Sequence, residues 1–319
     1  MGGTIVTEQP PSGAQPEYPG EPSQPTPDAY AGYPGARNLD PNDPLVAADY
    51  GGWWARGTAL ARKTWKHVLI LQIAFVVLEL ILITPVHIWQ ASLAVVPGSI
   101  APGQNPNDVL LAQSLGRQVG PILLSLVAGV LTQVIAAIIG LVVVHLMVMA
   151  ATNEQLDIGV AFQRASRRLG IIVLWSVIFG LLATIGFVLC VLPGFYVALV
   201  GMLLAPVVAF ERGNPLGQAF TLYNRNFGLA LGLTLTVVAC GLVAGIVAGC
   251  FGGALTIGSA VTGSTGAYIL SAVITVLISA VLTAAVQLLT YPLTTVAYAT
   301  LRARLEPLST AQLATEIAR

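Results

Sequence analysis

The sequence predicts an all-α, multi-pass membrane protein with six transmembrane helices, arranged as three repeats of a surface helix followed by a two-span hairpin. Its composition supports this class. Hydrophobic residues make up 55% of the 319 residues and charged residues only 9%, whereas a soluble domain carries roughly 25% charged residues. The apolar residues also fall in continuous runs of about 20 or more, the length that crosses about 30 Å of hydrocarbon.

The first 50 residues form a tail rich in Pro, Gly and Tyr. Such a composition cannot bury enough apolar surface to offset the entropy of ordering, so we expect residues 1–50 to be disordered. The tyrosines spaced through the tail allow two interpretations. They belong either to a multivalent segment that binds a protein partner or to a solvated extension without a partner.

An amphipathic helix is expected next, over Tyr50–Lys66. Trp53, Leu60 and Trp65 recur on one face at helical spacing, and the basic residues lie largely off that face. Tryptophan favours the depth of the lipid headgroups, and cations favour the phosphates. The pattern therefore predicts a helix that lies in the membrane interface and turns into the first span.

The six predicted spans are His67–Trp89, Pro121–Met149, Gly170–Val191, Phe195–Phe210, Leu229–Ala254 and Tyr268–Leu289. The segments Gln90–Gly120 and Thr256–Ala267 are expected to be loops. Helix is expected to continue beyond the sixth span to Arg304. The membrane domain would then cover residues 51–306, and residues 307–319 would form a polar C-terminal tail.

Prolines predict where these spans turn or bend. Pro193 and Gly194 predict a tight turn between the third and fourth spans. Pro206 and Pro292 each predict a kink, because proline lacks a backbone donor and clashes with the preceding helical turn. Such a kink is either fixed or a hinge, and the sequence leaves both open.

The basic residues predict the orientation in the membrane. The segments before span 1, between spans 2 and 3, between spans 4 and 5, and after span 6 contain 13 of the 14 Lys and Arg residues, all except Arg117. Cytoplasmic loops are enriched in Lys and Arg. We therefore expect a multi-pass protein of the plasma membrane with both termini in the cytoplasm.

Two short segments match each other closely. AFQRASRRLG (Ala161–Gly170) and AFTLYNRNFG (Ala219–Gly228) share Ala-Phe at the start, Arg at the seventh place and Gly at the tenth. Each directly precedes an apolar span, and Gly57–Lys66 stands in the same place before the first span. The match predicts a threefold repeat, with chance similarity of short apolar and basic segments as the alternative.

The ends of these surface helices carry their own signals. Asn214 followed by Pro215 predicts the start of the third surface helix, because Asn caps a helix N-terminus and Pro suits its first turn. Gly170 and Gly228 are expected to allow the sharp turn into the bilayer and close packing there.

Two longer segments carry a family resemblance. They are LPGFYVALVGMLLAPVVAFERGNPLGQAFTLYNRNFG (Leu192–Gly228) and TYPLTTVAYATLRARLE (Thr290–Glu306). They resemble bacterial membrane proteins that include the membrane domain of some glycerophosphodiester phosphodiesterases and stand-alone actinobacterial proteins with a Pro/Gly/Tyr-rich tail. The resemblance covers roughly residues 50–306. The activity of those enzymes belongs to a soluble catalytic domain, so the resemblance implies a fold and carries over no site residues.

Glu79, near the middle of the first span, is the sharpest candidate for a functional residue. A charged, unpaired carboxylate is costly in a bilayer, so we expect protonation or a partner. It is either a site that handles protons or cations, or a neutral group hydrogen-bonded to another span. Gln133 and His145 on the second span are candidate partners. His145 is alternatively expected at the inner interface, near Asn153 and Glu154.

The fifth span carries glycine at every fourth position, at Gly241, Gly245, Gly249 and Gly253. Such a stripe lets helices approach closely. We expect it to pack against another span of the same chain, and a homo-oligomer seam is the alternative.

Signals of catalysis are missing from the sequence. It contains no Gly-x-Ser-x-Gly, no His-Glu-x-x-His and no P-loop. Cys190, Cys240 and Cys250 lack metal-ligand spacing and are expected to be free, buried thiols. The net charge of zero gives no sign of nucleic-acid binding. We expect no enzyme and no cofactor.

The expected function is that of a membrane scaffold or regulatory protein. Its surface helices would contact the lipid bilayer, and its tail would offer a site for a protein partner. The alternative is a small transporter or channel that uses Glu79.

Overall fold

A computed structural model describes residues 40, 42–92, 106–262 and 264–318. The described residues form helices and no strands. Five of these helices are long and apolar enough to cross a membrane, and the bent pair α5–α6 makes a sixth candidate. This architecture is consistent with a multi-pass membrane protein. Most of the predicted tail, residues 1–39 and 41, lies outside the described residues.

The long helices are α1 (Tyr50–Ser92), α2 (Pro106–Ala151), α4 (Leu169–Leu189), α8 (Phe227–Thr262) and α9 (Thr265–Ala303). The shorter ones are α3 (Ile158–Ser166), α5 (Val191–Gly201), α6 (Leu204–Phe210), α7 (Pro215–Arg225) and α10 (Thr310–Ala318). Each long helix is apolar over most of its length, as burial in lipid requires.

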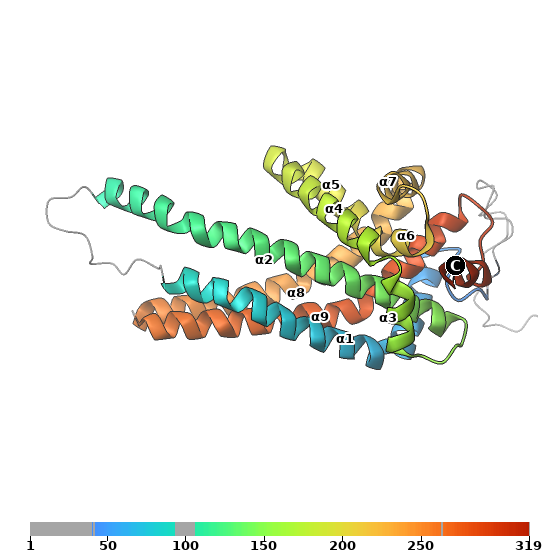
Figure 1. Ribbon diagram of the computed structural model, residues 1–319, viewed down its shortest axis with the longest axis horizontal. Coiled ribbons are helices and arrows are strands. Elements are labelled where there is room, and N and C mark those ends of the chain that lie inside the picture. Colours follow the sequence, from blue (N-terminus) through green and yellow to red (C-terminus); the bar gives the residue numbers. More distant parts are fainter. Residues whose placement is uncertain (1–39, 41, 93–105, 263, 319) are drawn as a thin grey trace, which may run out of the picture.

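The long helices form an elongated bundle (Figure 1). Helix α9 lies between α1 and α8 and contacts both along its length, and α2 packs beside α1. The α4–α5 hairpin leaves this bundle at an angle. Helices α3, α7 and α10 gather at one end, which we call the basic end. The core is densest there, because every residue of α2 from 139 to 151 is buried beneath the surrounding helices.

Three predicted boundaries are wrong. Helix α1 runs from Tyr50 to Ser92 without a break, so residues 50–66 form no separate surface helix. Helix α2 begins at Pro106, inside the predicted loop, and α8 continues through Thr262. The residues at these boundaries tolerate helix, and even Pro85 and Pro121 lie inside α1 and α2 without ending them.

The surface helices α3 and α7 have the expected kind of N-cap. The Asn214 side chain accepts hydrogen bonds from the amides of Leu216 and Gly217, as predicted. Asp157 caps α3 in the same way. Such caps satisfy amides that the helix itself leaves without acceptors.

The turns that follow α3 and α7 are not made by glycine. The chain leaves α3 at Arg167 and Arg168, and it leaves α7 at Asn226. Gly170 and Gly228 instead lie in the first turns of α4 and α8, and a Cβ at either would meet nothing within 4 Å. The prediction that these glycines make the turn and pack closely is therefore wrong.

The α4–α5 hairpin turns at Cys190, three residues before the predicted Pro193-Gly194 turn. The two helices cross closely just below this turn. A Cβ added to Gly186 would lie 2.7 Å from the Gly194 Cα. Close backbone approach of this kind requires glycine.

The fourth span bends by 40° between α5 and α6. The bend lies at Met202 and Leu203, one turn before Pro206. Proline at 206 gives no amide hydrogen for the carbonyl of residue 202, and its ring crowds that carbonyl. The predicted kink is thus confirmed, displaced by one turn toward the N-terminus.

The three cysteines are free, as expected. They are not buried inside the protein, however. Cys190 and Cys250 are exposed, and Cys240 is intermediate. Apolar runs in this chain therefore face outward as often as inward, because lipid replaces the protein interior as their surroundings.

Arg302 organises the charges of the basic end. Its guanidinium lies 2.6 Å from Glu316 on α10 and 3.4 Å from Glu211 after α6, and it also pairs with Glu306. The Tyr298 hydroxyl donates to Glu211 at 2.9 Å. These contacts join α6, α9 and α10 through one cation.

Arg168 ties the start of α4 to the end of α6. Its guanidinium donates to the backbone carbonyls of Val208 and Glu211, each at 2.6 Å. Burial, and then the nearby Arg212, lower the pKa of Arg168. The guanidinium nevertheless stays charged at physiological pH, and it supplies donors to carbonyls that a helix C-terminus leaves unpaired.

The two ends of the described chain pack against each other at the basic end. Asp43 accepts hydrogen bonds from the backbone amides of Leu45, Val46 and Thr310. Leu313 of α10 is buried in the core. Residues 307–319, predicted as a polar tail, thus contain a packed helix, and residues 43–47 of the predicted disordered tail are ordered and mostly buried.

Candidate functional site

Glu79 lies half-buried on α1. Its Oε2 atom is buried and has no hydrogen-bond partner. Neither Gln133 nor His145 bonds to it, so the structure brings together neither of the predicted pairs. The choice between a protonated Glu79 and one partnered by another span stays a prediction.

His145 is a core residue of α2. Its side chain is 2% exposed, and its Nδ1 lies 2.8 Å from the Leu141 carbonyl of the preceding turn. The residues expected beside it have other partners. Lys63 donates to Asn153, and Arg164 pairs with Glu154. His145 is therefore satisfied by its own helix within the protein core, and its placement at the depth of the inner interface stays a prediction.

Gln133 lines a polar cavity of about 290 Å³ between α2, α6, α8 and α9. The cavity lies beside the bend between α5 and α6, with Met202 and Pro206 in its wall. Its polar lining residues are Gln133, Gln287, Thr290, Tyr291, Thr294 and Thr295. We call this space the polar cavity.

Two glutamines near this cavity have unpaired amide atoms. Gln72 of α1 is 0% exposed, and neither its oxygen nor its nitrogen has a hydrogen-bond partner. The Tyr291 side chain interacts with Gln72, but its hydroxyl donates to the Ala136 carbonyl at 3.5 Å. The Gln287 oxygen is also buried and unpaired. Each unsatisfied group costs about 1–3 kcal/mol, so this region favours water or a polar solute.

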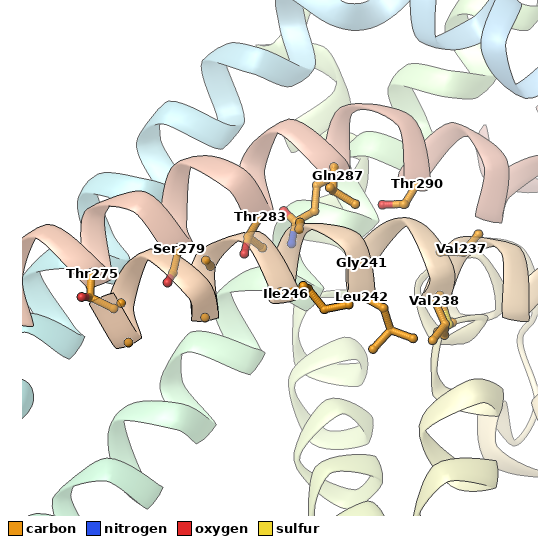
Figure 2. Close-up of a pocket in the computed structure, with 18 residues that line it drawn as sticks. Val237, Val238, Gly241, Leu242, Ile246, Thr275, Ser279, Thr283, Gln287 and Thr290 are labelled. Carbon is orange, nitrogen blue, oxygen red and sulfur yellow. The ribbon is translucent and has the colours of Figure 1, made fainter. Parts of the chain in front are cut away.

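The glycine stripe of α8 borders an open groove of about 980 Å³ (Figure 2). A Cβ added at Gly241, Gly245, Gly249 or Gly253 would meet nothing within 4 Å. The prediction that this stripe packs against another span of the same chain is therefore wrong. The close approach of α8 to α9 occurs instead at Gly252, whose added Cβ would lie 2.7 Å from Thr275. The homo-oligomer seam stays a prediction.

Helix α9 contributes a row of polar side chains to this groove, as Figure 2 shows. The row consists of Thr275, Ser279, Thr283, Gln287 and Thr290. Gln287 and Thr290 also line the polar cavity, so the groove and the cavity adjoin. This row was not predicted from the sequence, although its spacing of three and four residues marks one helical face.

Exposed cations cover the outer surface of the basic end. Lys63 donates to the Asn153 side chain. Five further exposed cations have no acidic partner among the described residues: Arg62, Lys66, Arg167, Arg212 and Arg225. They come from α1, from α7 and from the links that follow α3 and α6. This surface is suited to anionic groups such as lipid phosphates.

No protein-family model, curated protein or solved structure matches this chain. The resemblance to the phosphodiesterase membrane domains therefore stays a prediction. Within the part of the chain that the structure describes, no three His, Cys, Asp or Glu side chains gather in a way that suits a metal ion.

Proposed function

We propose that this chain is a non-catalytic scaffold of the plasma membrane whose basic end rests on the cytoplasmic leaflet. The observation that carries the proposal is the set of five exposed cations without acidic partners at that end. A Lys or Arg near an anionic membrane surface contributes about 1 kcal/mol of attraction. Both termini would then lie in the cytoplasm.

The basic end also suits the presentation of a partner-binding segment. Residues 43–47 are held against α10, so the described chain begins beside the cationic surface. Attachment to a protein held at the membrane raises the effective concentration of a binding segment there. In this proposal, residues 1–39 recruit a protein partner to the leaflet.

The threefold repeat is part of the same proposal. Helices α3 and α7 each end just before a long apolar helix, α4 and α8 respectively, and both begin at a side-chain cap. The first unit differs, because its surface segment is continuous with α1. The two pairs, α3 with α4 and α7 with α8, thus support a repeated unit that places basic residues on one side of the membrane.

Cysteine labelling tests the orientation. Cys190 is exposed at the hairpin turn, and Gly213 is exposed at the basic end. In intact cells, a membrane-impermeant maleimide should label Cys190 in a variant whose other two cysteines, Cys240 and Cys250, are changed to Ser. A Gly213→Cys variant in which all three native cysteines are changed to Ser should react only after permeabilisation, and the reverse pattern would overturn the proposed orientation.

Leaflet contact is tested in nanodiscs. The wild-type chain should unfold at a higher temperature in anionic phosphatidylglycerol than in zwitterionic phosphatidylcholine. A variant with all five cations changed to Gln should lose this difference. If the wild type shows no difference between the two lipids, the basic end does not act through the leaflet.

A second candidate function is a small transporter for uncharged polar solutes. It is favoured by the polar cavity, which adjoins the groove through Gln287 and Thr290. Reconstituted wild-type protein would then carry a solute such as glycerol faster than empty liposomes do. Gln287→Leu should abolish that flux, whereas Glu79→Gln tests the carboxylate separately. Flux lost in Gln287→Leu would overturn a scaffold-only function.

A further inference from the structure

A shallow apolar slot lies between α1 and α9 near the basic end. Its volume is about 240 Å³, and its walls are Ala61, Arg62, Trp65, Leu288 and Leu289. The leucines close the slot from α9, and the Trp65 ring closes it from α1. Such a slot accepts the first part of a hydrocarbon chain.

One cation, Arg62, lines this slot, and a second, Lys66, lies over the Trp65 ring that forms its wall. Arg62 and Lys66 lie one helical turn apart, so their side chains share one face of α1. Both are exposed, and neither has an acidic partner among the described residues. The Lys66 ammonium lies 5.6 Å from the centre of the Trp65 ring, and Trp65 is 47% exposed. The exposed Trp marks headgroup depth.

We propose that this slot binds one anionic phospholipid, with an acyl chain against Trp65 and Leu289 and the phosphate between Arg62 and Lys66. The inference rests on the proposed leaflet contact and adds a specific site to it. A free phosphate satisfies the two cations but leaves the apolar walls in water. A phospholipid satisfies both features at once, because its phosphate and its chain are joined.

Native mass spectrometry of the full chain in mild detergent tests the site. With phosphatidylglycerol added, the wild type should retain at least one lipid more than with phosphatidylcholine. The double variant Arg62→Gln and Lys66→Gln should lower the retained fraction about tenfold or more, since each cation contributes about 1 kcal/mol. The matched control is Arg167→Gln with Arg225→Gln, which removes the same charge elsewhere and should change retention less than about twofold.

Two further arms separate a lipid from a free phosphate. Trp65→Ala and Ala61→Phe keep both cations but alter the slot, one by removing its wall and one by filling it. Both should weaken retention, and Trp65 is exposed enough for its variant to fold. Excess glycerol 3-phosphate should not displace the bound phosphatidylglycerol.

Equal losses in the two double variants would overturn the slot while leaving a diffuse leaflet contact intact. Displacement of the lipid by glycerol 3-phosphate, or full retention in both Trp65→Ala and Ala61→Phe, would also overturn the slot. A wild type without preference for phosphatidylglycerol, together with no lipid effect on unfolding in nanodiscs, would remove the proposed leaflet contact as well.

Discussion

The basic end and the cavity region differ in how their buried polar groups are paired, although Oε1 of Gln218 at the basic end also lacks a partner. At the basic end, Arg302 meets three carboxylates, and Arg168 meets two backbone carbonyls. In the cavity region, which comprises the polar cavity, the groove and the adjacent Gln72, buried amide atoms lack partners and the glycine stripe is open. Paired charges therefore hold the basic end together, whereas the cavity region keeps open volume for a ligand, as is common for functional regions.

The substitution with the largest expected effect on stability is Arg302→Met. It leaves Glu211, Glu306 and Glu316 without their shared cation, and the Arg302 side chain is only 12% exposed. We expect the free energy of unfolding to fall by about 3 kcal/mol, because the carboxylate of Glu211, which is 18% exposed, and two more exposed carboxylates lose their shared cation. Chemical denaturation in detergent measures this change.

The matched control for that variant is Arg225→Met. Arg225 is an exposed basic-end cation with no acidic partner among the described residues. Its replacement should change stability by about 0.5 kcal/mol or less. Equal effects of the two substitutions would show that the network does not hold the basic end together.

The next test is Asp43→Ala, which should cost about 2 kcal/mol. Asp43 is buried, and three backbone amides donate to it, including that of Thr310. Its loss leaves those donors unsatisfied. Hydrogen exchange across residues 310–318 should accelerate. Asp40→Ala is the control, since Asp40 is exposed and its carboxylate accepts only the Asn42 amide in the described chain, while the backbone bond from Asp43 to the Asp40 carbonyl is kept.

Two glycine-to-alanine substitutions compare a helix face that is packed with one that is open. Gly186→Ala places a methyl against the Gly194 backbone, so we expect a loss of about 1–3 kcal/mol. Gly245→Ala meets open space and should gain about 0.5–1 kcal/mol, because alanine favours helix. Thermal unfolding measures both. A marked loss at Gly245 would instead indicate that a second copy covers the stripe.

The last substitution, Gln72→Met, tests the unpaired side-chain atoms of the cavity region. The substitution keeps the side-chain volume similar and removes two buried, unpaired atoms. Stability should rise by about 1 kcal/mol if those atoms are unsatisfied in the membrane. Gln133→Met is the control, because Gln133 is exposed at the cavity and should change little. A loss at Gln72 would show that the cavity holds a bound partner.

Features set by neighbouring residues could be predicted from the sequence. The apolar runs located every long helix, Asn214 capped α7, and Pro206 bent the fourth span. Each depends on local chemistry alone: hydrophobic length, a side-chain acceptor and a missing amide hydrogen. The positions where helices end were less accurate, as at Thr262, because no strong breaker stands there.

The candidate site was less predictable for a physical reason. Gln133 does line the cavity, but Gln72 becomes notable only because the packed helices bury it, and Gln287 only because α8 and α9 lie side by side. The glycine stripe allowed close packing, and only the bundle geometry decides whether a neighbour is there. Arg302 likewise meets Glu211 and Glu316 through contacts between distant segments.

The unbroken helix α1 has a mechanical consequence. Its 43 residues span about 64 Å at 1.5 Å per residue. Trp53 fastens it to α9 by donating to the Leu293 carbonyl at 2.8 Å. Residues 43–48, which precede it directly, are therefore attached to a strut that reaches most of the way along the bundle. Because α1 packs along α9, a displacement of this N-terminal segment would be opposed by the whole α1–α9 contact and not by the first helical turn alone.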